Sequence, residues 1–170
     1  MSAGFDPYRM LDVLQRHGVR YVVVGAFSAV AQGYPLSTSD LDVTPARDAE
    51  NLERLADALL ELGARLRIPR DEPVPFPVDA AMLGQATAWT LATDAGPLDL
   101  VFQPAGTAGY DDLVADSIEI RIRDMAIRLA SVRDVIRMKE AAGREKDMLT
   151  LPALRRTLEE IRRDERERGG

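Results

Sequence analysis

The spacing of apolar side chains divides the first part of the chain into alternating helical and extended segments. Apolar residues recur at helical spacing over residues 10–14, and a β-branched run follows at 19–24. A small, alanine-rich helical segment at 26–32 comes next, before a strand at 40–44 and a leucine-spaced helix at 51–62. The predicted order is therefore helix, strand, glycine turn, helix, strand and helix.

The middle of the chain is predicted to be mainly extended. Residues 64–68 indicate a short strand, after which four prolines between positions 69 and 77 favour a stiff connector. Two β-rich segments, 87–93 and 97–102, are joined by an Asp-Ala-Gly turn and predict a hairpin. Isoleucines alternate with polar residues over 117–123, which is typical of a half-buried strand.

Beyond residue 123 the pattern predicts helices alone. One begins at Val132 and is ended or bent by Gly143, and another spans residues 151–161. The charged tail 162–170 is expected to fray. Strands mixed with helices favour an α/β or α+β fold, with a mixed sheet flanked by helices, over a helix bundle.

Length and composition bound the organisation of the chain. With 170 residues and 46% apolar side chains it is long enough for one core, so we expect a single domain. We divide it into a core at residues 1–130 and a C-terminal helical extension at 131–170 that packs on the same domain. The net charge of −6 argues against an extended nucleic-acid-binding surface but is compatible with a local basic groove.

The residue types present also restrict metal chemistry and location. The chain has no cysteine and a single histidine, His17, so a bound metal must be held by oxygen ligands. The N-terminus lacks a basic patch followed by an apolar run, and no stretch reaches the ~20 apolar residues of a membrane span. We therefore expect a soluble, cytoplasmic protein without a membrane partner.

Three carboxylates are candidates for an oxygen-ligand site. Side chains alternate along a strand, so Asp40 and Asp42 should share one face while Leu41 and Val43 point into the core. Asp99 lies on the second strand of the predicted hairpin. Such a trio, following a glycine turn and a Ser/Thr-rich loop, is typical of a metal site for phosphoryl chemistry.

Two segments resemble one known family. The run from Val24 to Ala26, with Gly33 and the segment Thr38-Ser39-Asp40-Leu41-Asp42, looks like the signature of the nucleotidyltransferase superfamily, which has a polymerase-β-like fold. It resembles most closely the small bacterial nucleotidyltransferases of abortive-infection and toxin–antitoxin systems. Residues 135–147 resemble the C-terminal helical motif of that family, whereas residues 46–93 match only in their order of elements.

The resemblance implies a reaction and a set of roles. Asp40 and Asp42 would hold the Mg²⁺ that grips an NTP, and Asp99 would complete a site for a second Mg²⁺ and help to deprotonate the acceptor. Gly25 would let the backbone approach the phosphates at the start of the following helix. The implied nucleotide-binding residues are Gly25, Ala26, Ser28, Thr38, Ser39, Lys139 and Lys146. The two lysines would share a helix face if the helix runs through Gly143.

This chain also departs from the family pattern. Leu36 stands where many relatives carry an arginine, which predicts weak triphosphate affinity. Thr150 stands where relatives often carry an acidic residue, which favours a structural role for Asp147.

Three functions remain open at this point. The first is transfer of an NMP onto a tRNA end or a protein hydroxyl, in a toxin-like setting with a cognate antitoxin. The second is the same chemistry on a small acceptor such as an aminoglycoside, whose positive charge suits this acidic chain. The third is a non-catalytic nucleotide-binding or interaction module with a degenerate site.

Overall fold

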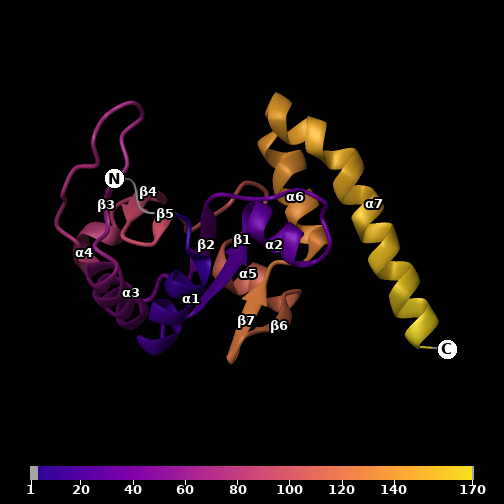
Figure 1. Cartoon of the computed structure of the whole chain (residues 1–170), viewed down its shortest axis with the longest axis horizontal. Coiled ribbons are helices and arrows are strands. Elements are labelled where there is room, and N and C mark those ends of the chain that lie inside the picture. Colours follow the sequence, from indigo (N-terminus) through magenta and orange to yellow (C-terminus); the bar gives the residue numbers. More distant parts are fainter. Residues whose placement is uncertain (1–3, 170) are drawn as a thin grey trace.

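The computed structural model describes residues 4–169, so the expectations for residues 1–3 and for Gly170 lie outside the described residues. A seven-stranded sheet runs through the molecule in the order β3-β4-β5-β2-β1-β7-β6, with helices on both faces (Figure 1). The strands are β1 (Tyr21–Val24), β2 (Leu41–Pro45), β3 (Arg65–Leu66), β4 (Ala88–Thr93), β5 (Gly96–Val101), β6 (Ile118–Ile122) and β7 (Met125–Leu129). The helices are α1 (Pro7–Arg16), α2 (Gly25–Ala31), α3 (Ala49–Glu61), α4 (Ala80–Leu83), α5 (Tyr110–Ala115), α6 (Val132–Ala142) and α7 (Glu145–Arg168).

The strand pairing confirms the predicted mixed sheet. β1 pairs antiparallel with β2 and parallel with β7, and β2 pairs parallel with β5. The predicted hairpin is present as β4 and β5, and β3 extends it at one edge. Among the described helices, none combines the length and the apolar character needed to cross a membrane.

The prediction of helices alone beyond residue 123 was wrong. β7 forms a hairpin with β6 and also pairs with β1. The turn between them contains no glycine, because Arg123 itself takes the left-handed conformation with a φ of 55°. β7 is a short alternating run with Ile127 and Leu129 buried and Arg128 exposed, and five residues are too few for this period to separate a strand from the start of a helix.

The C-terminal helices also differ from the prediction. Gly143 is left-handed, with a φ of 64°, and ends α6. A separate helix, α7, starts at Glu145, so Lys139 and Lys146 lie on two different helices rather than on one face of a continuous helix. The tail does not fray within the described residues, since α7 continues as far as Arg168 (Figure 1).

The two faces of the sheet bury different helices. On one face, α1 and α3 pack through Met10 and Leu55 against the side chains of Leu41 and Leu98. On the other face, apolar residues of α2, α5, α6 and α7 form a second cluster with β1 that includes Val24. This second cluster covers the part of that face around β1 and contains no residue of β3, β4 or β5. The helix-covered part of this face therefore ends near β2, between β1 and β5.

One buried amide joins β1, β2 and α3. The side chain of Asn51 is fully buried, and its Nδ2 donates to the carbonyls of Ala46 at 2.7 Å and Arg20 at 3.0 Å. Its Oδ1 accepts a hydrogen bond from the backbone N–H of Arg20 at 2.8 Å. These bonds satisfy backbone groups at the start of β1 and the end of β2, and thereby hold the pair of strands from which Asp42 projects.

We expect Asn51→Ala to lower the free energy of unfolding by about 2–4 kcal/mol, because it leaves buried backbone groups without partners. Urea denaturation followed by circular dichroism measures the loss. The control is Glu53→Ala, at an exposed position on the same helix, which should change the stability by less than about 0.5 kcal/mol. Equal stability of the two variants would contradict the role given to Asn51.

Candidate active site

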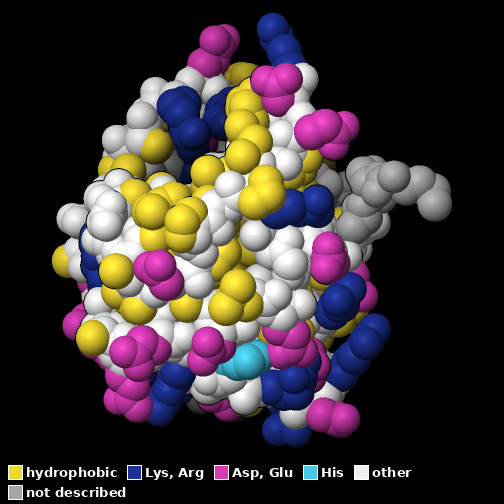
Figure 2. Space-filling model, turned by 90° about the vertical axis from the view of Figure 1, so that its left-hand side faces the viewer, with side chains coloured by type: hydrophobic (Ala, Val, Ile, Leu, Met, Phe, Trp, Pro, Cys, Tyr) yellow, Lys and Arg dark blue, Asp and Glu magenta, His cyan; other side chains and the backbone are white. Residues whose placement is uncertain are grey.

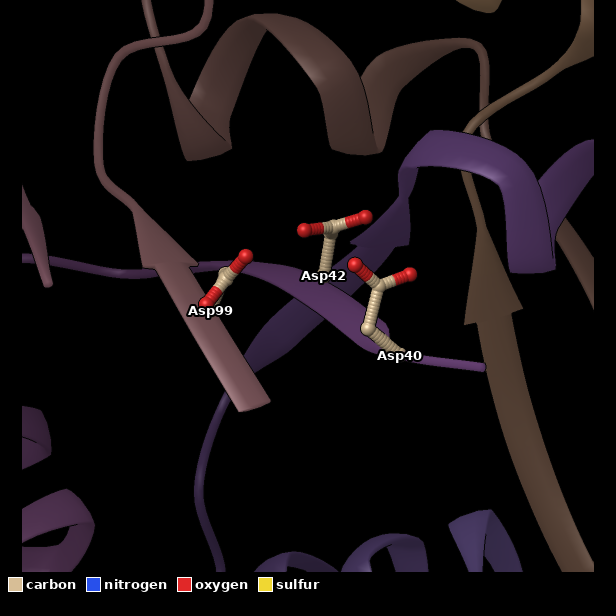
Figure 3. Close-up of side chains that lie close together, drawn as sticks. All are labelled: Asp40, Asp42 and Asp99. Atoms are coloured by element: carbon tan, nitrogen blue, oxygen red, sulfur yellow. The ribbon is translucent and has the colours of Figure 1, made fainter. Parts of the chain in front are cut away.

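Three carboxylates converge at the border of the helix-covered part of the sheet. Asp40 lies immediately before β2, Asp42 lies on it, and Asp99 lies opposite Asp42 on β5. Each offers an oxygen atom, and these oxygens all lie within 4.8 Å of one another. Figure 3 shows the three side chains rising from the same side of the two strands. The structure therefore brings together the trio that the alternation of residues predicted, with Leu41 and Val43 buried on the opposite face.

Crowding of like charges makes this site costly to keep ionised. Burial raises the pKa of Asp42 to about 7, and the charges of Asp40 and Asp99 add to the effect. Burial also raises the pKa of Asp99, although the neighbouring guanidinium of Arg67 opposes the shift. Mg²⁺ prefers oxygen ligands such as carboxylates, and a bound cation would offset the repulsion between the three negative charges. The residues present therefore fit a divalent cation.

Gly25 makes room for one of the carboxylates. It has a φ of +69°, and a Cβ built there would collide with Oδ2 of Asp42. Only glycine meets both conditions, since it tolerates the left-handed conformation and carries no side chain. The sequence predicted a backbone approach to phosphate at this position, and the structure adds a second requirement, which is clearance for Asp42.

A cleft of about 620 Å³ opens beside the three carboxylates and falls in the usual size range of small-molecule sites. One part of its lining is apolar and the other is cationic. The larger apolar residues are Val24, Val101, Pro104, Val135 and Met138, beside three alanines. The cationic residues are Lys139, Arg144 and Lys146, from the junction of α6 and α7.

A buried carboxylate organises this cationic wall. Asp147 is only 1% exposed and accepts hydrogen bonds from Nζ of Lys139 at 3.3 Å and from Nε of Arg144 at 2.6 Å. Burial works to raise the pKa of Asp147, but the hydrogen bonds from Arg144 and Lys139 outweigh it and lower the pKa. Thr150 donates to the carbonyl oxygen of Asp147 at 2.8 Å. These contacts support the structural role predicted for Asp147.

Most of the predicted nucleotide-binding residues lie at or beside the cleft. Gly25, Ala26, Lys139 and Lys146 line it. Thr38 is not part of the lining, but its hydroxyl donates to the carboxylate of Asp40 at 3.2 Å and to the Asp40 carbonyl at 3.1 Å, so it orients one carboxylate of the trio.

Ser28, Ser39 and Leu36 are not part of the cleft lining. Ser28 is completely buried, and its hydroxyl donates to the carbonyl of Ala130 at 2.6 Å, so in this structure it joins α2 to the end of β7. Ser39 is exposed. Leu36 is 58% exposed in the loop between α2 and β2.

The predicted site residues leave out two charged residues, Arg144, which lines the cleft, and Arg67, which contacts one of the carboxylates. Nη2 of Arg67 donates to Oδ1 of Asp99 at 2.7 Å. Arg67 follows directly after β3, and its backbone N–H bonds to the carbonyl of Thr90 on β4 at 3.0 Å. The pairing of the short β3 with the hairpin was the missing information, because no local motif marks Arg67.

Asp42→Asn should change how stability depends on pH. The folded carboxyl has a pKa of about 7, above the value of about 3.9 for an unfolded aspartate. Its stabilising contribution is therefore fully present below the unfolded pKa and is lost as the pH rises through 7. In EDTA, we expect the wild-type protein to lose stability relative to Asp42→Asn between about pH 4 and about pH 7, as measured by urea denaturation. A difference between the two proteins that stays constant with pH would refute this.

Gly25→Ala should weaken metal binding through displacement of Asp42. We expect affinity for Mn²⁺, measured by electron paramagnetic resonance, to fall by about tenfold or more. The matched control is Gly18→Ala, because Gly18 has a φ of +70° and its nearest neighbour is 3.7 Å from the new Cβ. Both variants should lose about 1–2 kcal/mol of stability from the left-handed backbone, but Gly18→Ala should keep its Mn²⁺ affinity. The same affinity in both variants would contradict the clearance role.

Three solved structures with a similar arrangement of elements are described as nucleotidyltransferases or adenylyltransferases or carry an adenylylated product. A lincomycin-bound lincosamide antibiotic adenylyltransferase, LnuA, matches with a TM-score of 0.58 and 14% identity over 89% of this chain and 98% of that chain. ANT(2'')-Ia in complex with adenylyl-2''-tobramycin matches with a TM-score of 0.57 and 15% identity over 96% and 97%. A candidate nucleotidyltransferase from Thermotoga maritima matches with a TM-score of 0.51 and 17% identity over 93% and 97%.

The comparisons by sequence give no relative. No protein-family model matches the chain, and no curated protein matches it. The structural likenesses are all below 25% identity, so they bear on the architecture of the chain, which agrees with theirs in its mixed sheet and flanking helices. The chain has the nucleotidyltransferase fold.

Proposed function

We propose that this protein is a Mg²⁺-dependent nucleotidyltransferase that moves an NMP from an NTP onto a hydroxyl acceptor. The observation that carries the proposal is the convergence of Asp40, Asp42 and Asp99 at a cleft that cationic side chains also line. Carboxylates that gather a cation next to lysines and an arginine suit a triphosphate, which carries negative charge along its length. The fold shared with LnuA and ANT(2'')-Ia supports this assignment.

Each residue of the trio has a role in this reaction. Asp40 and Asp42 would hold Mg²⁺, which when bound neutralises triphosphate oxygens and stabilises the charge that develops during transfer. Asp99 accepts the proton of the acceptor hydroxyl as the oxygen attacks the α-phosphorus and pyrophosphate leaves. Its raised pKa suits this task, because a more basic carboxylate takes up a proton more readily.

The remaining lining residues divide into two groups. Lys139 and Lys146 supply charge for the departing phosphates, and the pairing of Lys139 with Asp147 fixes the position of its ammonium group. The apolar residues Val135 and Met138 of α6 provide a contact surface for a nucleobase or for an apolar part of the acceptor.

Two acceptor classes fit the fold. A tRNA end or a protein hydroxyl, in a toxin-like setting with an antitoxin partner, follows from the resemblance of the signature segments. A small antibiotic fits about equally, because LnuA and ANT(2'')-Ia act on antibiotics and each is covered by this chain over nearly its whole length. A non-catalytic module is the weaker option, since all three carboxylates are present and placed together.

A thermal-shift titration with each NTP, with and without Mg²⁺, tests the proposal. Ligand at about one hundred times its dissociation constant should stabilise the wild-type protein by ~2.7 kcal/mol. Asp40→Asn should abolish the Mg²⁺-dependent part, because it removes a metal-facing charge. Asp57→Asn, which neutralises an exposed aspartate on α3, is the matched control and should behave as wild type.

Transfer of labelled NMP completes the test. The acceptors to offer are tRNA, bulk protein, tobramycin, lincomycin and water alone. Label on any acceptor, or release of NMP, should require Mg²⁺ and should be lost in Asp40→Asn. An unaltered Mg²⁺-dependent shift in Asp40→Asn, or the absence of NTP binding by the wild-type protein, would overturn the proposed function.

A further inference from the structure

A single row of paired residues crosses the sheet at the carboxylates. Val24 lies opposite Asp42, Asp42 opposite Asp99, and Asp99 opposite Thr90. The hydrogen bond from the backbone N–H of Arg67 to the carbonyl of Thr90 continues the row to the edge strand. Residues paired in this way project from the same face of a sheet. The row therefore extends the site beyond Asp99, away from the helices that form the cleft.

The row becomes more exposed toward this edge. Val24 is buried beneath the second apolar cluster, the side chain of Asp99 is 19% exposed, and that of Arg67 is 34% exposed. On β4 the side chains of this face are small and accessible, namely Ala88 and Thr90. We call these two exposed residues the floor, because they lie on the same face of the sheet as Asp99, on the side of β5 away from β2.

A loop closed by two backbone hydrogen bonds follows β3. The backbone N–H groups of Leu66 and Val74 each donate to the carbonyl of the other residue, at 2.8 and 2.9 Å. Residues 67–73 therefore form a loop that is closed at its base, directly after β3. In Figure 1 this loop and the junction of α6 and α7 rise on either side of the region where β2 and β5 lie. Figure 2 views the molecule from the loop side and shows Lys and Arg side chains beside hydrophobic ones near a hollow in its upper part.

The geometry of transfer assigns the two sides of Asp99 to different substrates. In-line displacement requires the attacking hydroxyl and the departing pyrophosphate to lie on opposite sides of the α-phosphorus. If the pyrophosphate leaves toward Lys139 and Lys146, the acceptor must approach over β4 and β3. Arg67 is the charged side chain that an acceptor would meet there beside Asp99.

Arg67 has the chemistry of an oxyanion-binding group. Its planar guanidinium carries several donors, of which Nη2 is used by Asp99. Its Nε is buried and has no acceptor among the described residues, so the present contact leaves part of the guanidinium unsatisfied. A phosphate group is a better partner, because it offers several oxygens and can pair with two donors at once.

We propose that the floor formed by Ala88 and Thr90, together with Arg67, is the acceptor site, and that it takes a hydroxyl compound with a neighbouring phosphate group. This inference rests on the proposed function. The acceptor phosphate draws the guanidinium of Arg67 from Asp99 and so frees a carboxylate oxygen to take the hydroxyl proton. The hydroxyl oxygen then bonds to the α-phosphorus, and the bond from that phosphorus to the pyrophosphate oxygen breaks. A polycationic acceptor is disfavoured, because it would bring an ammonium group against Arg67.

A pair of probes that differ only in a phosphate tests this site. Ribose 5-phosphate and ribose are offered with labelled NTP and Mg²⁺, beside tRNA and tobramycin. We expect the wild-type protein to prefer ribose 5-phosphate over ribose by about tenfold or more in kcat/KM, since a charge-assisted hydrogen bond is lost with ribose. Labelling of tRNA but not of ribose 5-phosphate would identify an RNA end as the source of the same chemistry, and it should depend equally on Arg67.

Three variants separate the charge of Arg67 from its structural contribution. Arg67→Gln should remove the preference for phosphate mainly through KM. Arg67→Lys should keep part of the preference, because lysine keeps the positive charge but lacks the two parallel donors of the guanidinium. Arg65→Gln, which removes an arginine two residues earlier whose Nη2 lies 4.0 Å from Asp94, should keep the preference. All three should retain Mg²⁺-dependent NTP binding.

Binding of inorganic phosphate gives a readout that needs no turnover. With a non-hydrolysable NTP analogue and Mg²⁺ present, phosphate should raise the Tm of the wild-type protein and of Arg65→Gln, but not that of Arg67→Gln. The acceptor proposal fails if no phosphate-bearing probe, tRNA included, produces an Arg67-dependent effect, or if tobramycin or lincomycin is labelled in preference to every phosphate-bearing probe. If NTP binding itself is absent, the proposed function has failed and the acceptor site falls with it.

Discussion

The parallel pairing of β2 with β5 places Asp42 directly opposite Asp99, and the rest of the site depends on this contact between like charges. Two neighbouring carboxylates would favour separation, but the buried leucines and valines on the reverse face fix the register of both strands. A shift by one residue would turn the carboxylates into the core, where their burial would be prohibitive. Burial of the apolar side chains on one face therefore fixes the positions of the carboxylates on the other. The free energy of that burial offsets the repulsion between the carboxylates.

At Asp147, by contrast, the charges that lie close together have opposite signs. A carboxylate that is 1% exposed gathers Lys139 and Arg144 and is itself stabilised by them. Removal of one member of such a pair is costly, because a buried charge is then left without compensation. Gly143 contributes by ending α6 and allowing α7 to begin at Glu145, which brings Asp147 back toward Lys139. The cationic wall is thus built by a helix break that the sequence signals through one glycine.

Local patterns predicted that the three carboxylates lie close together, but they did not predict the contacts of Ser28 and Arg67. The alternation in residues 40–43 gave the common face of the two aspartates, and the turn at residues 94–96 gave the hairpin that carries Asp99. Ser28 was placed among the nucleotide contacts by position in the signature, yet its hydroxyl bonds to the carbonyl of Ala130, which belongs to a region predicted to be helical. Arg67 was missed for a related reason, since only strand pairing brings it to Asp99.

The contact between Arg67 and Asp99 also bears on the number of metal ions. Asp40, Asp42 and Asp99 carry three negative charges when fully ionised, and one Mg²⁺ together with the Arg67 guanidinium balances them. A second divalent ion at Asp99 would compete with the guanidinium for the same oxygen and would leave the trio overcharged. That excess is removed when a triphosphate arrives with its own negative charge. Under the proposed function, the free protein would therefore favour a single ion, and a second ion at Asp99 would require both the nucleotide and the movement of Arg67 to another partner.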